Sequence, residues 1–540
     1  MSALRSRFEG HAAAWLVAAI AALGLALRLR MLGNSLFGDE LSTYSIVTGR
    51  GPGAIVSLLD GHSVDLTPPL SFLLAWLATR LGRSPETLRL FPLLAGTATI
   101  PLTYLIGARL LSRAAAATGA LLVALSPFLI FFSTEARAYA VATALALTST
   151  LALLQALDSG RRGWWALYAV ASCAAVYSHY TALFVLVAQA GWALAVHRER
   201  AAALLGANLV AAAGFAPWLP ALVRNTHSFG TKIFELLDPF GWHAISHDVV
   251  RWAVGHPFLA LGTEPGPVGV VLIAAGVIAG AALARPAPSP RGWLVALLAL
   301  ATPVGLALYS AVGTDTWDVR NLICSWPGLA LAMAALAAAP RGWWRALTIG
   351  AVTLGYTIGA VNLLAADHQR PDYAAAAQLI LAHGRSDSVA IVAAPTPGPY
   401  AAMDASLDYA GDPGRALERI GSGPLQEIMR AAPYAPLAPT PPAQLAARTT
   451  SAELFMVVPG TVPLAQLQRS GAVNARRALG PVFGTGINGR LLATVYVPVS
   501  AYLRALAGRY AAARTVHLPG FMPLSVYMLR RRSPLQSGPP

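Results

Sequence analysis

Long apolar runs, separated by short polar loops, dominate the first 364 residues of the chain. A helix needs about 20 mostly apolar residues to cross a hydrocarbon core about 30 Å thick. Eleven runs approach or reach this length, so the pattern predicts eleven transmembrane helices. They cover residues 12–29, 89–111, 114–132, 138–156, 163–178, 181–196, 201–222, 267–284, 292–312, 321–338 and 343–364. We interpret the first run as a retained helix, because it is longer than the apolar core of a signal peptide.

Two loops between the runs are long. The first covers 33–86 and contains PPLSFLLAWLATRLG at 68–82, which is apolar but too short for a confident span. We expect this stretch to form a helix along the outer membrane face. The second long loop, 223–266, is rich in His, Trp and Pro.

The pattern changes after about residue 365, where prolines and polar residues increase and no further spanning run appears. Short β-like runs appear instead: SVAIVAA from Ser388, LFMVVP from Leu454, LLATVYVPV from Leu491 and PLSVYML from Pro523. Residues 372–383 are expected to form a helix. Mixed short strands and helices are typical of an α/β domain. The sequence therefore predicts a transmembrane domain over 1–364 and an extracytoplasmic α/β domain over 365–540, which ends in a disordered tail.

Composition supports the membrane assignment, since 56% of the residues are hydrophobic and only 12% are charged. Soluble domains average about 25% charged residues. Disorder is excluded, because it needs low hydrophobicity and high charge. The net charge of +15 does not favour nucleic acid, because the arginines stand singly or in pairs between apolar runs.

Arginine placement predicts the orientation, because basic residues favour cytoplasmic loops. One side of the predicted membrane collects Arg5, Arg7, Arg109, Arg113, Arg161, Arg162, Arg198, Arg200, Arg285, Arg291, Arg341 and Arg345. We therefore expect a multi-pass protein of the cytoplasmic membrane, with its N-terminus inside and its C-terminal domain outside. Arg28 and Arg30, at the outer end of the first run, count against this orientation unless they snorkel to the interface.

Two groups of ionisable residues at predicted outer helix ends contain carboxylates. Asp39 and Glu40, with Tyr44, follow the first run in FGDELSTY. Adjacent carboxylates can bind a cation or accept a proton from a hydroxyl, but an acidic pair can also simply begin a helix. Glu135 and Arg137 stand in the tight loop FFSTEARAYA, where they either serve the chemistry or neutralise each other as a structural clasp.

Two further groups lie on the same predicted side. His179 and Tyr180 end the run 163–178, and such a His is either a ligand or a packing residue. Arg320 follows Asp315 and Asp318. A guanidinium there suits a phosphate, which it grips with two hydrogen bonds, or it forms an ion pair with a nearby aspartate. Together the four groups suit a lipid-phosphate substrate, and the chain has no P-loop and no GxGxxG after a strand.

Five segments, in order, resemble the bacterial GT-C glycosyltransferases. They are FGDELSTY, TPPLSFLLAWL, LRLFPLLAGTATIPLTYLIGARLL, FFSTEARAYA and YSHYTALFVLVAQ. The nearest group contains predicted membrane mannosyltransferases related to protein O-mannosyltransferases and the lipid A aminoarabinose transferase. The resemblance covers residues 12–200 well and is looser in VRNLICSWPGLALA and RPDYAAAAQLI.

The resemblance implies transfer of a sugar, with inversion, from a polyprenyl-phosphate donor to an acceptor on the outer face. Asp39 matches a first-loop aspartate that acts as base or helps to hold the acceptor and any metal, and Glu40 stands in the same motif. Glu135 and Arg137 match the second-loop motif. The candidate ligands of a divalent metal ion are Asp39 and Glu135.

The remaining roles follow in the same way. Arg320 matches an arginine expected near the donor phosphate, and Arg137 is a second candidate to bind that phosphate. SHY at 178–180 matches a position often written His-Tyr. Tyr44, His179 and Tyr180 are then substrate-binding candidates. The family commonly has His where this chain has Thr67, just before the PPL-type motif, and Asp65 or His62 could compensate. This departure leaves the acceptor open between a cell-envelope glycan, a lipid and a protein, and mannose is a guess from the family label.

Two other functions stay open at this stage. A non-enzymatic transporter or flippase of lipid-linked saccharides would also need charges along a cavity. It would carry polar residues deep within its spans, whereas here they gather at one end. A relative that only binds a lipid-linked sugar differs from the enzyme in forming no product.

Overall fold

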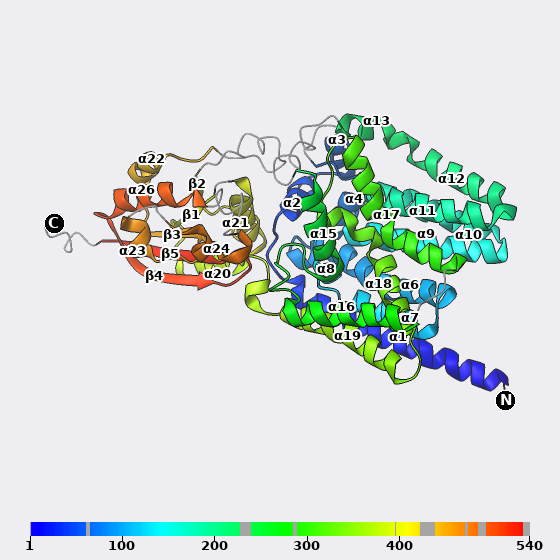
Figure 1. The fold of residues 1–540 in the computed structure, drawn as a ribbon. Helices are drawn as coiled ribbons and strands as arrows, with labels where there is room; N and C mark the ends of the chain where they lie inside the picture. The colour runs from blue at the N-terminus through cyan, green and yellow to red at the C-terminus, as the bar shows by residue number, and fades with distance from the viewer. Residues whose placement is uncertain are drawn as a thin grey trace. The chain divides into compact units, whose positions relative to one another are not determined.

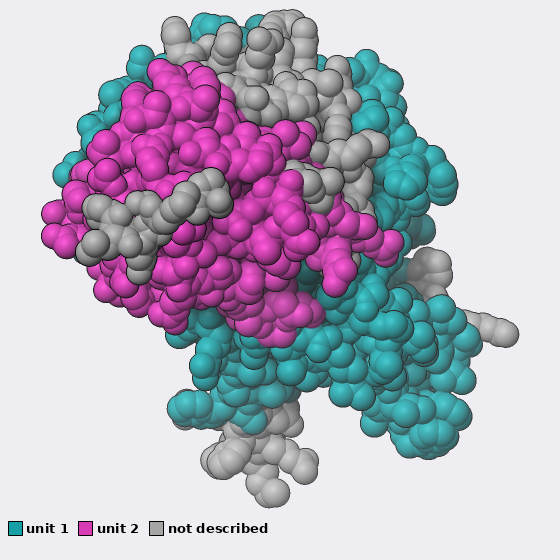
Figure 2. Space-filling view, turned by 90° about the vertical axis from the view of Figure 1, so that its left-hand side faces the viewer, with its two compact units in different colours: residues 1–32, 49–82, 86–364 teal, residues 33–48, 83–85, 365–540 magenta. Residues whose placement is uncertain are grey.

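The computed structural model describes residues 2–60, 65–226, 239–284, 289–394, 396–421, 438–469, 473–483 and 493–532. They form two compact units, coloured separately in Figure 2. Unit 1 comprises Met1–Leu32, Gly49–Gly82 and Glu86–Leu364, and unit 2 comprises Gly33–Thr48, Arg83–Pro85 and Ala365–Pro540. His62 and part of the loop 223–266 lie outside the described residues.

Unit 1 is helical (Figure 1). The helices that form from the predicted runs are α1 (Ser2–Leu32), α6 (Leu90–Leu110), α7 (Arg113–Leu125), α8 (Pro127–Ser133), α9 (Tyr139–Ser159), α10 (Arg162–Ser178), α11 (Ala182–Val196), α12 (Ala201–Phe215), α16 (Gly266–Ala284), α17 (Pro290–Val312), α18 (Trp326–Ala338) and α19 (Trp343–Asn362). Among the described residues, seven helices are long and apolar enough to cross a membrane, or eight if the bent pair α7–α8 is one span. The protein is thus a multi-pass membrane protein. The count of eleven spans stays a prediction, because α10, α11 and α19 are shorter or less apolar than the others.

Shorter elements connect these helices. They are α3 (Pro52–Leu59), α4 (Pro69–Ala78), α5 (Pro85–Leu88), η1 (Arg198–Arg200), η2 (Ala216–Trp218), α13 (Leu219–Thr226), α15 (Trp242–Val254) and η4 (Val319–Ser325). The short apolar stretch at 68–82 forms α4, as expected. The described part of the loop 223–266 includes α15. Trp252 of this helix is 3% exposed, and its carbonyl accepts the indole N–H of Trp326 at 2.8 Å.

The run 114–132 forms two helices in place of one continuous helix, and the prediction that it makes a single span stays a prediction. The helices α7 and α8 meet at Ser126 and Pro127 with a bend of 59°. Pro127 has no N–H to continue the helix, and the Ser126 hydroxyl caps α8 by accepting the N–H of Leu129 at 3.2 Å.

The carbonyls left over at the end of α7 are bound by an arginine of α1. Arg28 is 0% exposed and donates to Val123 O and Ala124 O, both at 3.3 Å. It also donates to Gly24 O in its own helix at 2.9 Å. The expectation that Arg28 snorkels to the interface is therefore wrong. Its charge lies where the helix dipole and two carbonyls attract a cation.

Unit 2 contains a five-stranded sheet in the order β2-β1-β3-β5-β4. The strands are β1 (Val389–Ala393), β2 (Leu417–Ile420), β3 (Glu453–Pro459), β4 (Tyr510–Leu518) and β5 (Leu524–Arg531). The pairs β1–β2 and β1–β3 are parallel, whereas β3–β5 and β4–β5 are antiparallel. The helices are α2 (Glu40–Val47), η5 (Ala366–His368), α20 (Tyr373–His383), α21 (Pro397–Tyr409), α22 (Pro442–Arg448), α23 (Leu464–Arg469), α24 (Ala475–Phe483) and α26 (Tyr496–Leu506). The predicted α/β fold of this region is confirmed.

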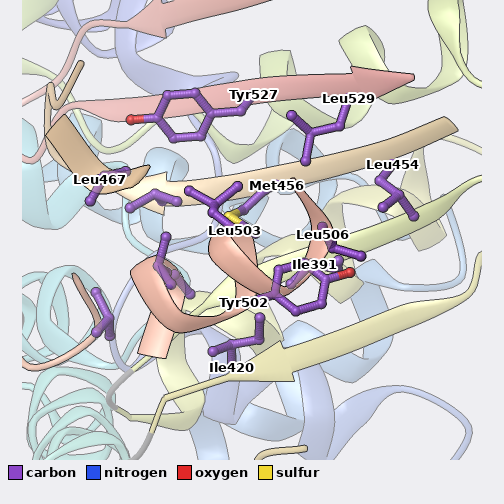
Figure 3. Close-up of a cluster of buried hydrophobic side chains, with 14 of the residues drawn as sticks. Ile391, Ile420, Leu454, Met456, Leu467, Tyr502, Leu503, Leu506, Tyr527 and Leu529 are labelled. Carbon is purple, nitrogen blue, oxygen red and sulfur yellow. The ribbon is translucent and has the colours of Figure 1, made fainter. Parts of the chain in front are cut away.

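The sheet buries a core against α26, shown in Figure 3. Tyr502 and Leu503 of α26 pack against strand residues such as Ile391 and Met456, which are all at most 2% exposed. Three predicted strands form β1, β3 and β5, but the fourth, LLATVYVPV, is wrong, since residues from Tyr496 onward form α26. The buried residues of α26, from Tyr496 to Leu506, recur every three or four positions, which is the period of a helix.

Candidate active site

An aspartate and an arginine from distant parts of unit 1 form a buried ion pair. Arg137 donates from Nη1 to Oδ2 of Asp65 at 2.6 Å and from Nη2 to Oδ1 at 3.1 Å. Their side chains are only 6% and 5% exposed. Burial acts to raise the pKa of Asp65, but the Arg137 guanidinium outweighs it and holds the pKa below its usual value. The two side chains therefore form a charged, bidentate ion pair.

Thr67, which stands where the family commonly has His, belongs to the same cluster. Its hydroxyl accepts a hydrogen bond from Nη2 of Arg137 at 2.9 Å, and its backbone N–H donates to Oδ1 of Asp65 at 3.1 Å. The Arg137 guanidinium also lies over the ring of Phe72 in α4, 5.5 Å from its centroid. The residues that precede α4 thus bind Arg137 directly.

The turn between α8 and α9 brings Arg137 to this position. The Thr134 hydroxyl donates back to the carbonyl of Ile130 at 3.1 Å, and α8 ends at Ser133. The backbone N–H of Arg137 then donates to the carbonyl of Glu135 at 2.7 Å, which closes a tight turn before α9. Glu135 is itself buried, at 7% exposed, in that turn.

His179 lies between α10 and α11, next to this cluster. Its ring is 5.3 Å from the ring of Tyr139, and its Nδ1 is 2.9 Å from the Thr181 hydroxyl. Burial and the positive charges of Arg137 and Arg320 lower the pKa of His179 to about 3. The imidazole is therefore neutral at physiological pH. Because the N–H of Thr181 also donates to Nδ1 (3.4 Å), the proton is assigned to Nε2.

Tyr180 and Arg320 are two further predicted site residues of unit 1. The Tyr180 hydroxyl accepts the indole N–H of Trp218 at 3.0 Å. Arg320 lies in the first turn of η4, pairs with Asp318 at 3.3 Å and is 28% exposed, so it is far more accessible than Arg137. Asp315 instead accepts the backbone N–H groups of Phe240 and Trp317, at 2.8 and 3.0 Å, and organises the loop.

The FGDELSTY residues belong to unit 2. The helix α2 begins at Glu40, as expected if the acidic pair starts a helix, and Asp39 is the partly exposed residue before it. Glu40 is 0% exposed and lies 3.7 Å from Nε of Arg370. The Tyr44 hydroxyl donates to the carboxylate of Asp408 in α21.

Asp39 and Glu135 are the two candidate ligands of a divalent metal ion. Nowhere in the described ranges do three or more His, Cys, Asp or Glu side chains come close enough to hold a metal ion. We assign no step to a metal, and a divalent ion held by Asp39 or Glu135 stays a prediction.

Sequence reasoning missed the partners of several predicted residues. The sequence does not single out Arg370 or Asp408 by itself, although Arg370 lies in RPDYAAAAQLI, one of the segments with a looser family resemblance. Arg28 was considered only as a topology signal. An arginine inside an otherwise apolar run is itself a signal of a buried role, because such a charge is costly without partners.

Comparison with known proteins agrees with this architecture. Residues 67–223 match the family model for dolichyl-phosphate-mannose-protein mannosyltransferase. The fold is similar to a crystal structure of ArnT from Cupriavidus metallidurans in the apo state, with a TM-score of 0.51 and 13% identity over 82% of this chain and 93% of that chain. No curated protein matches the sequence. The resemblance to GT-C glycosyltransferases is confirmed by the family model and by the fold.

Two weaker structural similarities were also found. ArnT from Cupriavidus metallidurans bound to undecaprenyl phosphate has a TM-score of 0.48 and 13% identity, over 82% of this chain and 92% of that chain. The Archaeoglobus fulgidus oligosaccharyltransferase tethered with an acceptor peptide has a TM-score of 0.48 and 12% identity, over 78% of this chain and 65% of that chain.

Proposed function

We propose that this protein is an inverting GT-C glycosyltransferase that uses a polyprenyl-phosphate sugar, with mannose as the sugar. One observation carries the proposal: the segment matched by the mannosyltransferase model, 67–223, holds Thr67, Arg137 and His179 of the cluster built around Asp65. The GT-C fold supports the same class. We place the reaction at the outer face of the cytoplasmic membrane, where arginine placement puts these helix ends.

The proposed reaction exchanges one bond for another at the anomeric carbon. The oxygen of an acceptor hydroxyl forms a bond to that carbon, and the bond from the carbon to the phosphate oxygen breaks. The polyprenyl phosphate leaves with the electron pair, while the hydroxyl proton passes to the carboxylate of Asp39 as general base. Attack opposite the leaving group inverts the anomeric centre, so no covalent nucleophile is needed.

Arg320 is the better of the two arginines for the donor phosphate. Both Nη atoms of Arg137 already bind Asp65 and Thr67, and its side chain is 6% exposed. Arg320 is 28% exposed and lies 3.3 Å from Asp318, so a phosphate can reach its guanidinium. A guanidinium beside the leaving phosphate stabilises the negative charge that grows there.

The acceptor is proposed more broadly, as a glycan, lipid or protein of the cell envelope. Nucleotide sugars do not cross the membrane, so a transfer on its outer face needs a lipid-linked donor that can be flipped. His179 and Tyr180, with Tyr44 and Asp65, are proposed to bind or orient substrate. A neutral imidazole can donate from Nε2 without adding charge.

The test uses purified protein in liposomes, with membranes of a deletion strain as acceptor source. We expect transfer from polyprenyl-phosphate mannose and none from a nucleotide sugar alone. Arg320→Ala should weaken donor use, and Arg320→Lys should restore it only in part, because a point charge cannot replace the planar fork. Arg109→Ala is the matched control, since Arg109 is similarly exposed (33%) and also paired, with Asp158. Transfer directly from a nucleotide sugar would defeat the proposal.

A further inference from the structure

The segment that carries Asp39 is built into unit 2, together with residues more than 300 positions away. Glu40, the neighbour of Asp39, lies 3.7 Å from Arg370, and the two side chains are 0% and 1% exposed. The Glu40 carboxylate also accepts the backbone N–H of Phe37 at 3.2 Å, which closes the turn around Asp39. A buried charge is costly unless it is paired, so Glu40 and Arg370 depend on each other.

The start of this segment is held by two further parts of the C-terminal region. The Ser35 hydroxyl accepts the backbone N–H of Ala374 at 2.8 Å, in the first turn of α20. The Phe37 ring packs edge-on against Phe521, with 5.3 Å between centroids. Phe521 in turn donates its N–H to the carbonyl of Gln369 at 2.8 Å, beside Arg370.

The other end of the segment is held by α21. Tyr44 of α2 donates its hydroxyl to Asp408, and Arg83 lies 3.9 Å from the same carboxylate. The helix α2 has only eight residues, and a helix this short is not stable by itself. These tertiary contacts therefore help to fix its geometry.

We propose that Arg370 is a positioning residue for the transfer reaction, which acts through Glu40 to hold the turn that presents Asp39. The inference rests on the proposed function, in which Asp39 is the base, and it gives the C-terminal domain a role as scaffold of the acidic motif. A displacement of about 1 Å at a reacting group can lower the rate on the order of 100-fold. Loss of Arg370 should thus lower kcat rather than raise KM.

The experiment measures turnover and hydrogen exchange on the full-length protein in detergent. Arg370→Met should lower kcat on the order of 10- to 100-fold with KM little changed, and it should speed exchange in peptides of 33–48. Peptides of β3 should keep their protection. Arg370→Lys should recover part of kcat. Arg415→Met is the matched control, because Arg415 is also buried (7%) and paired, with Asp412 at 2.6 Å, and it should change neither readout.

Three results decide the matter. Unchanged kcat and unchanged exchange at 33–48 in Arg370→Met would overturn the inference. If that variant also loosens β3, the deciding variant is Glu40→Gln/Arg370→Gln, which removes both charges of the pair together. Low kcat with protected β3 in that variant supports the role, and normal kcat rejects it. Full activity of Asp39→Asn would instead defeat the proposed base, while the exchange result would still stand.

Discussion

The buried pair of Asp65 and Arg137 allows a sharp test of whether it serves the reaction or only the fold. Asp65→Asn removes one charge and leaves a guanidinium that is 6% exposed without its carboxylate. Breaking a buried pair from one side costs about 3–5 kcal/mol. Thr67 still accepts one hydrogen bond from Arg137, so we take the lower end, about 3 kcal/mol. This corresponds to roughly a hundredfold change in the unfolding equilibrium.

The matched control is the pair of Arg109 and Asp158, whose nitrogen and oxygen are 2.8 Å apart. Their side chains are 33% and 67% exposed, and exposed pairs contribute about 0–1 kcal/mol. Asp158→Asn should therefore leave the free energy of unfolding nearly unchanged. Equilibrium unfolding in mixed detergent micelles, followed by tryptophan fluorescence, compares the two variants.

A double variant then separates stability from function. Asp65→Leu/Arg137→Met should recover most of the lost free energy of unfolding, because it removes both charges of the pair together. Sugar transfer should stay low, because the ion pair no longer joins the turn between α8 and α9 to the loop before α4. If Asp65→Asn costs no more than Asp158→Asn, the energetic reasoning is wrong. If the double variant regains transfer, the pair is only a structural clasp.

Three further outcomes are expected. Asp39→Asn should leave the protein folded but lower turnover at least ~100-fold, with Glu40→Gln less severe, and near-normal turnover of Asp39→Asn would contradict the base assignment. Because burial and nearby guanidiniums lower the pKa of His179 to about 3, well below the ordinary pKa of a histidine, the unfolded chain takes up this proton first as the pH falls. Stability should thus fall as pH drops below about 6.5, and His179→Asn should reduce that loss in acid unfolding curves. With Cys173 and Cys324 replaced, Ser246→Cys should react with an impermeant thiol reagent on intact cells. Ser159→Cys should react only after permeabilisation, and the reverse labelling pattern would invert the predicted topology.

Most helices of unit 1 could be predicted because apolar side chains continue along almost the whole length of each helix. The break between α7 and α8 could not. Pro101 and Pro303 lie inside unbroken helices α6 and α17, so a proline alone does not predict a break. What differs at Pro127 is the Arg28 guanidinium that binds the released carbonyls, a contact across about a hundred positions.

In unit 2 the missed strands are those at the edges of the sheet. Most residues of β4 are exposed, and β2 has only four residues, LERI, so neither shows a buried apolar face. The sequence pattern of a strand predicts that strand when one or both of its faces are buried, as in β1, β3 and β5.

The candidate site was found as separate groups, and the contacts between them were not. Adjacency in the chain linked Arg137 with Glu135, whereas the structure also pairs Arg137 with Asp65, 72 positions earlier. The departure at Thr67 cast doubt on its loop, yet Thr67 is a hydrogen-bond partner of Arg137. A single sequence shows residue types and their spacing, but which side chains pair across helices depends on how the helices pack.

The contacts around Asp39 also set an order in time for the synthesis of the protein. Ser35 bonds to the start of α20, 337 and 339 positions later, and Tyr44 bonds to Asp408 after 364. At about 5–20 residues per second, the ribosome needs roughly 17–70 s to make the intervening chain. Until then the acidic motif has left the ribosome, but these partners from the C-terminal region are missing. A nascent or truncated chain that ends near residue 364 would carry Asp39 on an unsupported segment, so this motif is completed only when the last domain has folded.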